Sequence, residues 1–310
     1  MPQTVNLRYD SQTRLARPAQ FNEMNSPLRL RLLTRADLAF ADSVRALAGW
    51  NQTMEDWERF LSAEPDGCFL AEWNGASAGT ATTTVYGRDL AWIGMVLVHP
   101  EFRRRGIGRA LLERCVEYLR CRGVRCIKLD ATPLGEKVYA GLGFKDEWTL
   151  TRWECSGFQS PSRVSGSRTR GWRESDVRGM QSLDSEAFGV ARKCILQGLA
   201  QQSRFALVLD SNSRRSAGYG LLRAGSQALY LGPVVATSAE GGIHLVESLL
   251  AQNQGARTLW DIPDSNDAAA KWAKQNGFTP QRTLTRMYLG ENSAPGDPRK
   301  QFALAGPEIG

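Results

Sequence analysis

The residues best suited to chemistry form one short basic segment in the first half of the chain. Arg103-Arg104-Arg105-Gly106-Ile107-Gly108 follows an apolar run that ends at Val98, and Arg109 comes next. Apolar residues recur at helical spacing from Ile107 onward, which predicts a helix that begins at the glycines. A helix start presents unpaired backbone N–H groups and a partial positive charge, and glycine lets an anion approach that backbone. The segment therefore predicts a binding site for a pyrophosphate.

Two common phosphate-binding motifs do not fit this segment. A dinucleotide fingerprint requires Gly-x-Gly-x-x-Gly, but Leu111 occupies the third glycine position. The phosphate loop of nucleotide triphosphatases requires Gly-Lys-Ser/Thr, which is absent here. The simplest alternative is a solvated basic helix start that binds no ligand.

Strands and helices that would position this segment can be predicted on both sides of it. Residues 90–98 form a long apolar strand that Pro100 stops, and Gly123 ends the helix that follows. Residues 124–129 predict the next strand, parallel to the first because a helix crosses between them. Thr132-Pro133 opens a further helix, and residues 148–153 predict a last strand.

The segment before residue 90 predicts a strand, two helices and a hairpin. We expect a strand over residues 28–33 and a helix that starts near Thr34, whose hydroxyl can cap it. A second helix is expected around residues 55–61. Asn74-Gly75 between two strand-like runs is a strong signal for a hairpin turn.

The second half repeats part of the first. Gly143-Phe144 is followed by Thr149-Leu150-Thr151-Arg152, and Gly277-Phe278 is followed at the same spacing by Thr283-Leu284-Thr285-Arg286. Each match ends a predicted helix and opens a predicted strand, which indicates a duplicated architecture. Residues 229–235 would be the central strand of the second copy and residues 243–250 its helix.

Composition limits the class of protein. The chain has 310 residues, 42% of them hydrophobic, which favours two folded domains. Its net charge of +7 fits an anionic ligand. Six cysteines without a Cys-x-x-Cys pair and two histidines predict no metal site and no disulfide framework. Residues 1–27 hold no apolar run of signal length, and no run of 18 apolar residues occurs, so we expect a cytoplasmic protein with no membrane partner.

Two motifs together resemble a known family. Arg-x-x-Gly-x-Gly after a strand ending Val-His-Pro-Glu-Phe resembles motif A of the GNAT superfamily of N-acetyltransferases, and Tyr139 to Phe144 resembles that family's Tyr-x-x-x-Gly-Phe segment. The resemblance covers residues 28–153, and residues 168–290 resemble a second, degenerate GNAT domain. It implies an α/β fold of two GNAT-like domains, each a mixed, mainly antiparallel sheet flanked by helices. The expected segments are a flexible arm (1–27), a catalytic domain (28–154), a linker (155–168), a degenerate domain (169–290) and a tail (291–310).

The resemblance implies acetyl-CoA as the cofactor and gives roles to individual residues. Tyr139 would lie near the cofactor sulfur and donate a proton to it; a packed helix residue is the alternative. Backbone groups of one strand would pair with the pantetheine arm, and the basic loop would hold the pyrophosphate. The expected cofactor-binding residues are Val96, Leu97, Val98, Arg103, Arg104, Arg105, Gly106, Ile107, Gly108 and Arg109.

The general base and the acceptor side are less defined. Some family members carry a glutamate on the central strand, but residues 92–98 contain no acid. Asp130 is one candidate base; its alternatives are a carboxylate that caps a turn, and a water relay. Trp50, Asn51 and Trp57 would form a substrate wall, with Glu55 and Asp56 attracting a cationic amine.

The second half lacks this chemistry. Residues 236–242 contain no arginine, and Ala273 stands where the repeat places Tyr139, so we expect no acetyl transfer there. The tail from Phe302 is apolar enough to dock.

The expected function is transfer of an acetyl group from acetyl-CoA to a primary amine by direct attack in a ternary complex. The acceptor is a small-molecule or peptide amine, and the sequence does not indicate the oligomeric state. One alternative is a CoA-binding sensor or scaffold without turnover. A nucleic-acid binder is disfavoured because basic and aromatic residues do not interleave.

Overall fold

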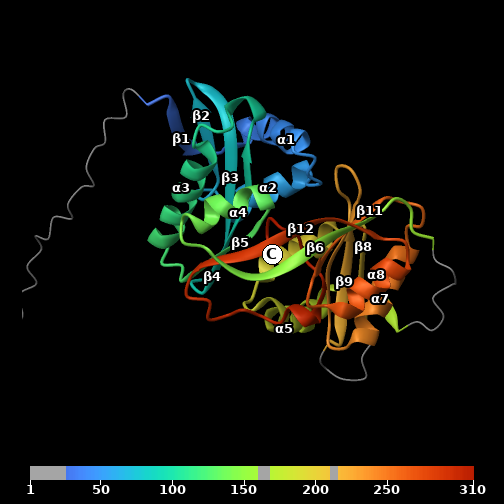
Figure 1. Cartoon of the computed structure of the whole chain (residues 1–310). Helices are drawn as coiled ribbons and strands as arrows, with labels where there is room; N and C mark the ends of the chain where they lie inside the picture. Colours follow the sequence, from blue (N-terminus) through green and yellow to red (C-terminus); the bar gives the residue numbers. More distant parts are fainter. Residues whose placement is uncertain (1–25, 160–167, 210–215) are drawn as a thin grey trace, which may run out of the picture.

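The computed structural model describes residues 26–159, 168–209 and 216–310 (Figure 1). Nearly all of the predicted arm and most of the predicted linker lie outside the described residues. The first half contains β1 (Leu28–Leu32), η2 (Arg35–Asp37), α1 (Leu38–Leu47), α2 (Met54–Ala63), β2 (Phe69–Trp73), β3 (Ala76–Tyr86), β4 (Leu90–Val98), η3 (Pro100–Phe102), α3 (Ile107–Cys121), β5 (Cys126–Ala131), α4 (Pro133–Ala140) and β6 (Lys145–Cys155).

The second half repeats this order of elements. It contains β7 (Thr169–Gly171), η4 (Glu174–Asp176), α5 (Val177–Phe188), α6 (Lys193–Gln202), β8 (Phe205–Leu209), β9 (Gly218–Arg223), β10 (Leu229–Ala236), α7 (Ala239–Ala251), β11 (Thr258–Pro263), α8 (Asp267–Gln275), β12 (Thr279–Gly290), η5 (Pro298–Lys300) and β13 (Gln301–Ala303). The central strand β4 has the predicted bounds, and most other predicted elements shift at their ends by a few residues. The duplication inferred from the repeat is confirmed by the shared element order.

Local sequence signals explain several element ends. Thr53 caps α2, since its side chain accepts from the Asp56 amide while the Asp56 carboxylate accepts from the Thr53 amide. Asn74 and Gly75 have φ angles of 50° and 81°, the left-handed backbone that this hairpin turn needs. Thr132 caps α4, which has Pro133 in its first turn.

Within the described residues, the strands form one continuous sheet. Their order is β1-β2-β3-β4-β5-β12-β6-β11-β10-β9-β8-β7, and β13 pairs with β10 off this path. Among the described strands, only β4–β5 and β10–β11 pair in parallel. Alternate residues of β4 enter different cores: Leu90 and Trp92 pack with α1 and α2, whereas Ala91 and Ile93 pack with α3. The predicted fold class is confirmed, but the two halves share one sheet.

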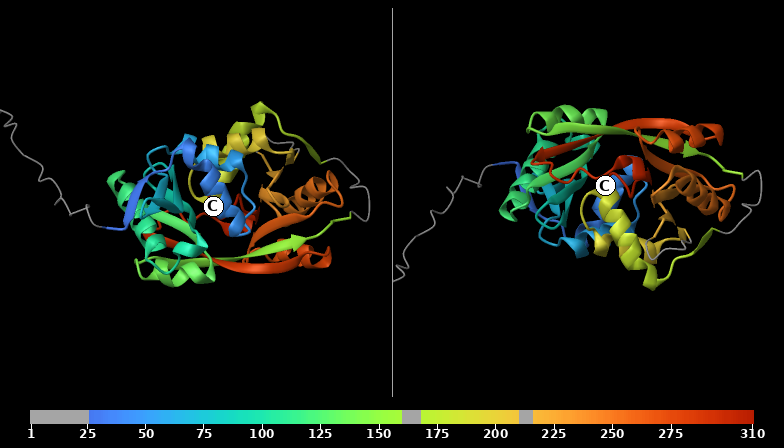
Figure 2. Two further views of the ribbon diagram at one scale, coloured as in Figure 1. Left: turned by 90° about the horizontal axis from the view of Figure 1, so that it is seen from above. Right: turned by 90° about the horizontal axis from the view of Figure 1, so that it is seen from below.

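The two halves exchange a strand. β6 follows α4 of the first half but pairs with β11 of the second, and β12 follows α8 of the second half but pairs with β5 of the first. β6 and β12 also pair with each other along most of their length. Figure 2 shows these two strands side by side, spanning both lobes. The sheet of each half is therefore completed by the other half, and neither half is a separate sheet.

The repeat predicted from the sequence lies at the centre of this exchange. In the β6–β12 ladder Leu150 pairs with Leu284, and the threonines on either side pair across. Leu150 and Leu284 are the same position of the repeat, so a local two-fold axis passes between them. The same symmetry relates two buried ion pairs, Arg286 with Asp130 and Arg152 with Asp261, and each joins an exchanged strand to its new neighbour.

The segment after β13 docks between the halves. Residues 301–306 and 308–310 are buried, and Figure 2 places the chain's last residues at the centre of the molecule, between the two lobes. Ala305 and Ile309 belong to a hydrophobic core that also contains Trp57 of α2 and Leu199 of α6. The prediction that the apolar tail docks is confirmed.

Candidate active site

The site is built where β4 and β5 separate. The two strands pair at Ala91 and Trp92 only, so beyond Trp92 no strand of the described residues pairs with β4 on this side. The register between β3 and β4 shifts next to Met95, whose φ is 50°, and the Thr80 hydroxyl donates to the Met95 carbonyl at 2.9 Å. This bulge bends β4 at the point where it separates from β5, and bulges are often found next to active sites.

The backbone of Val96, Leu97 and Val98 lies along this opening. Leu97 is buried, whereas Val96 and Val98 are half-buried. On the β5 side these residues have no strand partner among the described residues, although the Val98 carbonyl accepts from Arg103 Nε. An unpaired strand edge of this kind can accept an added strand. Their pairing with a pantetheine arm stays a prediction.

The helix start next to the opening fits an anion. Gly106 caps α3 with a φ of 78° and has no side chain to accept from the first-turn amides. A Cβ at Gly106 would meet no atom within 4 Å, so it would project into open space. The amides of Ile107, Gly108 and Arg109 precede the first intrahelical donor, Ala110. Unpaired amides at an open helix N-terminus are what a phosphate group needs.

Arginines surround this helix start. Arg103, Arg104, Arg105 and Arg109 are all exposed. Arg103 donates to the Val98 carbonyl, and the Arg105 guanidinium lies over the rings of Trp73 and Phe102. Within the described part of the chain, Arg109 pairs only with exposed Glu113, so its charge remains accessible. The structure therefore places the predicted pyrophosphate residues together at one helix mouth.

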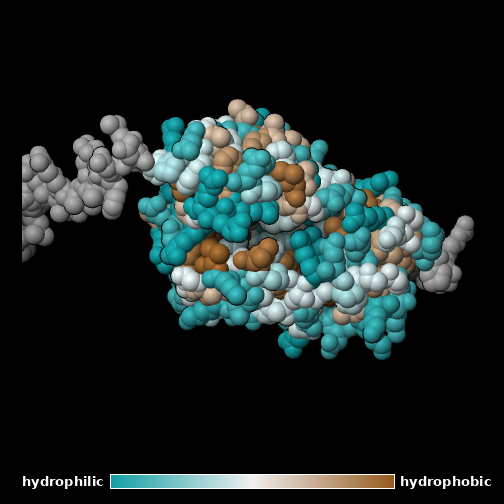
Figure 3. All heavy atoms as spheres, turned by 45° about the horizontal axis from the view of Figure 1, so that its top comes forward, coloured by the Kyte–Doolittle hydropathy of each residue, from teal (hydrophilic) through white to brown (hydrophobic). Residues whose placement is uncertain are grey.

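A cavity of about 60 Å³ adjoins the opening. Its lining comes from both halves and from the tail: Trp50, Gln52, Ile93, Gly94, Met95, Val96, Leu129, Asp130, Thr132, Tyr139, Arg282, Leu284, Pro307 and Glu308. Figure 3 shows hydrophobic residues gathered around a hollow on one face of the molecule, with hydrophilic residues surrounding them. The cavity joins Tyr139, Trp50 and Asp130, which were predicted from separate parts of the sequence.

Tyr139 has the properties of a proton donor. Its ring packs near Phe144, and no hydrogen bond of its hydroxyl occurs among the described residues. Burial raises the pKa of the Tyr139 phenol to about 12, so the group keeps its proton at neutral pH. Its catalytic role stays a prediction.

Asp130 lies in a buried ion pair at the edge of the cavity. It lines the cavity, but both of its carboxylate oxygens accept from Arg286, at 2.8 and 2.9 Å. The Arg286 guanidinium is itself held between the rings of Trp92 and Trp148. Burial raises the pKa of Asp130, and Arg286 opposes that rise. A carboxylate fixed in this way joins the exchanged strand β12 to β5, which favours the structural alternative. Its role as a general base stays a prediction.

The structure separates the three residues of the predicted substrate wall, whose contact with a substrate stays a prediction. Trp50 lines the cavity. Asn51 does not: its side chain binds the backbone of Gln227 and Ala228 and so joins the two halves. Trp57 is fully buried against Phe60 and is a core residue.

The proposed attraction of a cationic amine by acids of α2 also fails for Asp56. Its carboxylate is buried, caps the helix and pairs with Arg59. It is therefore already neutralised inside the protein.

Sequence reasoning missed Glu308 and Gln52. Both are buried, and Gln52 Nε2 donates to Glu308 Oε2 at 2.7 Å. The available signal was a lone acid in an apolar tail that was expected to dock, because such a carboxylate must become buried. Gln52 carried no signal, since its position in the cavity depends on how the tail packs.

The equivalent site of the second half is filled by the chain itself. β10 and β11 also separate, but β13 pairs with Val234 and Val235, the residues that match Val96 and Leu97. The Ser238 side chain caps α7 by accepting from Gly241, and Phe302 occupies the space beside Gly242. Pro233, at the position of Met95, has no N–H to donate. These features support the prediction of no acetyl transfer in this half.

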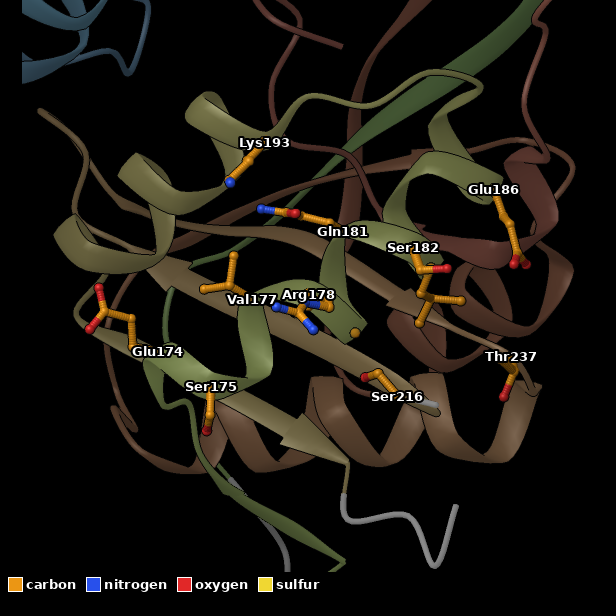
Figure 4. Close-up of a pocket in the computed structure, with 12 residues that line it drawn as sticks. Glu174, Ser175, Val177, Arg178, Gln181, Ser182, Glu186, Lys193, Ser216 and Thr237 are labelled. Atoms are coloured by element: carbon orange, nitrogen blue, oxygen red, sulfur yellow. The ribbon is translucent and has the colours of Figure 1, made fainter. Parts of the chain in front are cut away.

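A larger cavity of about 810 Å³ lies in the second half (Figure 4). Residues of α5, including Arg178 and Gln181, line it together with Lys193 and Thr237. It contains none of the predicted site residues. Tyr139, Asp130, Trp50 and Val96 are the predicted site residues that line the smaller cavity.

The comparisons with known proteins agree with this geometry. Residues 36–144 match the family model described as acetyltransferase (GNAT) family, and residues 180–303 match a model described as acetyltransferase (GNAT) domain. The two matches together span about three-quarters of the chain. The chain belongs to the GNAT superfamily, as a tandem-domain N-acetyltransferase. This superfamily transfers an acyl group from an acyl-CoA to an amine.

Individual relatives support the same class. The uncharacterized N-acetyltransferase YitH of Bacillus subtilis is 28% identical over 63% of this chain and 67% of its own length. The holothin acyltransferase of a Pseudoalteromonas species is 24% identical over 84% of this chain and 87% of its own. A crystal structure of a Pyrococcus horikoshii protein assigned as an acetyltransferase superposes with a TM-score of 0.79 at 24% identity, covering 96% of this chain and 100% of that one, and shows the shared fold.

In the described part of the chain, no helix has the length and apolar character that a bilayer crossing requires.

Proposed function

We propose that the first half transfers an acetyl group from acetyl-CoA to a primary amine by direct attack in a ternary complex. The observation that carries the proposal is the open, glycine-capped start of α3, ringed by exposed arginines, beside the unpaired edge of β4. Arg104 to Arg109 would hold the pyrophosphate through backbone amides, and Val96 to Val98 would pair with the pantetheine arm. Acetyl-CoA supplies the acyl thioester when bound.

The residues of the cavity support direct attack. No cysteine, serine, lysine or histidine is among the residues that line it, so an acyl-enzyme on one of these four side-chain types has no support. The Tyr139 hydroxyl is the proton donor to the departing sulfur. The amide at the β4 bulge, near Val96, is the candidate donor to the oxygen that becomes negative during attack.

The cavity favours a small acceptor that carries a negative charge. Its volume of about 60 Å³ leaves room for the amine end of an acceptor with a compact group attached to it. Arg282 lines it, makes no ion pair among the described residues, and has a pKa lowered to about 10 by burial and by Arg152. A carboxylate on the acceptor would relieve this buried charge. One relative is named for a single acceptor, holothin, rather than for a protein.

An amine panel tests the proposal. The purified chain is incubated with acetyl-CoA and phenylalanine, phenethylamine, spermidine or a tripeptide, and released thiol is measured. We expect turnover, with phenylalanine preferred over phenethylamine because it adds only a carboxylate. Initial rates at varied concentrations of both substrates should give intersecting lines, the pattern of a ternary complex. CoA binding without any acetylated acceptor would instead favour a sensor.

A further inference from the structure

Glu308 differs from the other buried acids of the molecule. Asp56, Glu64, Asp130, Glu147, Asp184 and Asp261 each form a salt bridge with an arginine or lysine. Glu308 is 5% exposed and has no such partner among the described residues. A buried carboxylate without a cation is costly unless it serves a purpose, and such groups concentrate at functional sites.

The tail places the Glu308 carboxylate at the opening between β4 and β5. The Trp92 indole donates to the Pro307 carbonyl at 2.9 Å, and the Tyr86 hydroxyl donates to the Ile309 carbonyl at 2.8 Å. Gly94 allows the tail backbone to lie directly on β4, because a Cβ there would come within 2.5 Å of the Glu308 carbonyl oxygen. Hydrogen bonds on both sides of Glu308 thus fix it in the wall of the cavity that contains Tyr139.

A neighbouring polar atom completes the arrangement. Gln52 is 8% exposed and lines the same cavity; its Nε2 holds Glu308, while its Oε1 is buried and has no partner in the described structure. An unpaired acceptor beside a carboxylate suits a group that brings several N–H donors. A substrate ammonium has this property.

From this geometry we propose that Glu308 is the proton acceptor for the attacking amine, with Gln52 Oε1 as a second acceptor for its N–H groups. The proposal deepens the proposed function and rests on it. It supplies the base that β4 lacks and that Asp130 is not free to provide.

The ammonium gives one proton to a carboxylate oxygen of Glu308, and the nitrogen electron pair then forms the C–N bond with the acyl carbon. The C–S bond breaks with its electron pair on sulfur, which takes the Tyr139 proton. The second N–H proton passes to water, water reprotonates Tyr139, and Glu308 releases its proton to solvent. The products are an amide, free thiol and one proton.

The charges around Glu308 suit this role. Burial and the Asp56 charge raise the pKa of Glu308 to about 7, against the opposing effects of Arg223, the Glu308 amide and Gln52. Asp130, Arg282 and Tyr139 also line the cavity, and Arg152, Tyr86 and Tyr230 lie close enough to interact electrostatically. A base with a pKa near the working pH is the most effective.

The test compares Glu308→Gln, Glu308→Asp and, as a control for the same chemical change at an exposed position, Glu240→Gln. For each variant kcat/KM is measured against pH with the best acceptor of the panel, and CoA binding by calorimetry. We expect Glu308→Gln to lower kcat/KM by about 10²- to 10⁴-fold. It should also remove the acidic limb of the pH profile, which is the fall in kcat/KM as the pH drops below about 7. Glu308→Asp should keep the limb at a lower rate, and CoA affinity should not change.

A second acceptor separates a proton acceptor from a structural residue. An alkoxyamine such as 2-phenylethoxyamine is already neutral at pH 7, so it needs no base to become nucleophilic. Glu308→Gln should slow phenethylamine much more than the alkoxyamine, whereas a merely structural role would slow both alike. An active wild type with an equal loss for both, or with no loss, would overturn the role of Glu308 and leave the proposed function standing. A wild type inactive toward every amine would overturn both.

Discussion

Gly94 of β4 and Glu308 of the tail are in direct backbone contact. A Cβ on Gly94 would lie 2.5 Å from the Glu308 carbonyl oxygen and 2.9 Å from its Cα. The equivalent residue Gly232 has the same relation to Leu304, whose carbonyl oxygen would lie 2.0 Å from a Cβ. The tail therefore crosses both strand openings at a glycine, and it passes from the opening beside β10 to the cavity beside β4.

The first prediction concerns this contact. Gly94→Ala should displace residues 306–310, because backbone atoms have no side-chain rotamer by which to yield. We expect kcat/KM to fall about tenfold or more, while CoA affinity stays within about twofold, since α3 is untouched. Activity, calorimetry and limited proteolysis of the tail would measure these effects.

Gly198→Ala is the matched control for that variant. Gly198 lies within α6, and a Cβ there would meet no atom within 4 Å. The control should be neutral or slightly stabilising, because alanine favours a helix. Full activity in Gly94→Ala would show that the position of the tail does not matter for turnover.

The second prediction concerns the helix start of α3. Gly106→Ala places a methyl group where an anion would approach and adds strain of about 1–2 kcal/mol at φ 78°. Gly277→Ala, at φ 83° and also in open space, adds the same strain in the second half. We expect both variants to lower the melting temperature similarly, and only Gly106→Ala to weaken CoA binding, by tenfold or more in calorimetry. Equal CoA affinities would refute the pyrophosphate site.

The third prediction concerns Tyr139. Tyr139→Phe removes the hydroxyl but keeps the ring that packs near Phe144. We expect kcat to fall about 10²-fold or more, with stability and CoA affinity nearly unchanged, because a general acid acts only in the chemical step. A variant with wild-type kcat would show that the sulfur is protonated by water.

The fourth prediction separates structure from catalysis at Asp130. Asp130→Asn leaves the Arg286 charge buried without a partner, and Asp261→Asn does the same to Arg152. Each change should lower the free energy of unfolding by about 3–5 kcal/mol, measured in denaturant. The folded Asp130→Asn protein should keep the wild-type acidic limb of its pH profile. Loss of that limb with unchanged stability would restore Asp130 as the base.

Local sequence signals predicted the positions of the helices and strands better than they predicted which strands pair with one another. The Thr132 cap, the Asn74-Gly75 turn, the apolar run of β4 and the periodicity of α3 act between residues a few positions apart, and the structure confirms them. The predicted cap at Thr34 makes no side-chain capping hydrogen bond. The exchange of β6 and β12 depends on contacts between residues far apart in the sequence. Asp130 of β5, for example, pairs with Arg286 of β12, which lies more than 150 residues further along the chain. The repeat indicated duplication, but it carried no information on whether the copies pair within a half or across.

The same distinction explains the site. Arg103 to Arg109 and Tyr139 belong to contiguous motifs, so their types and spacing could be recognised. Trp57 and Asn51 have side chains typical of a binding wall, and only packing shows that one is core and the other joins the halves. Glu308 reaches the cavity through a docked tail, and residue types alone do not specify that path.

The last prediction concerns stability against pH. The pKa of Glu308 in the folded protein is raised from 4.5 to about 7, so the folded state holds this proton more tightly than the unfolded chain does. Its protonated form is therefore favourable below pH 4.5, and that advantage is lost as the pH rises through 7, at a cost of about 3 kcal/mol. Glu308→Gln cannot ionise, so it should be more stable than the wild type above pH 7, and the difference should vanish toward pH 4.5. Denaturant unfolding at both pH values, with Glu240→Gln as the exposed control, measures this; a difference that does not change with pH would mean that the buried carboxylate titrates normally.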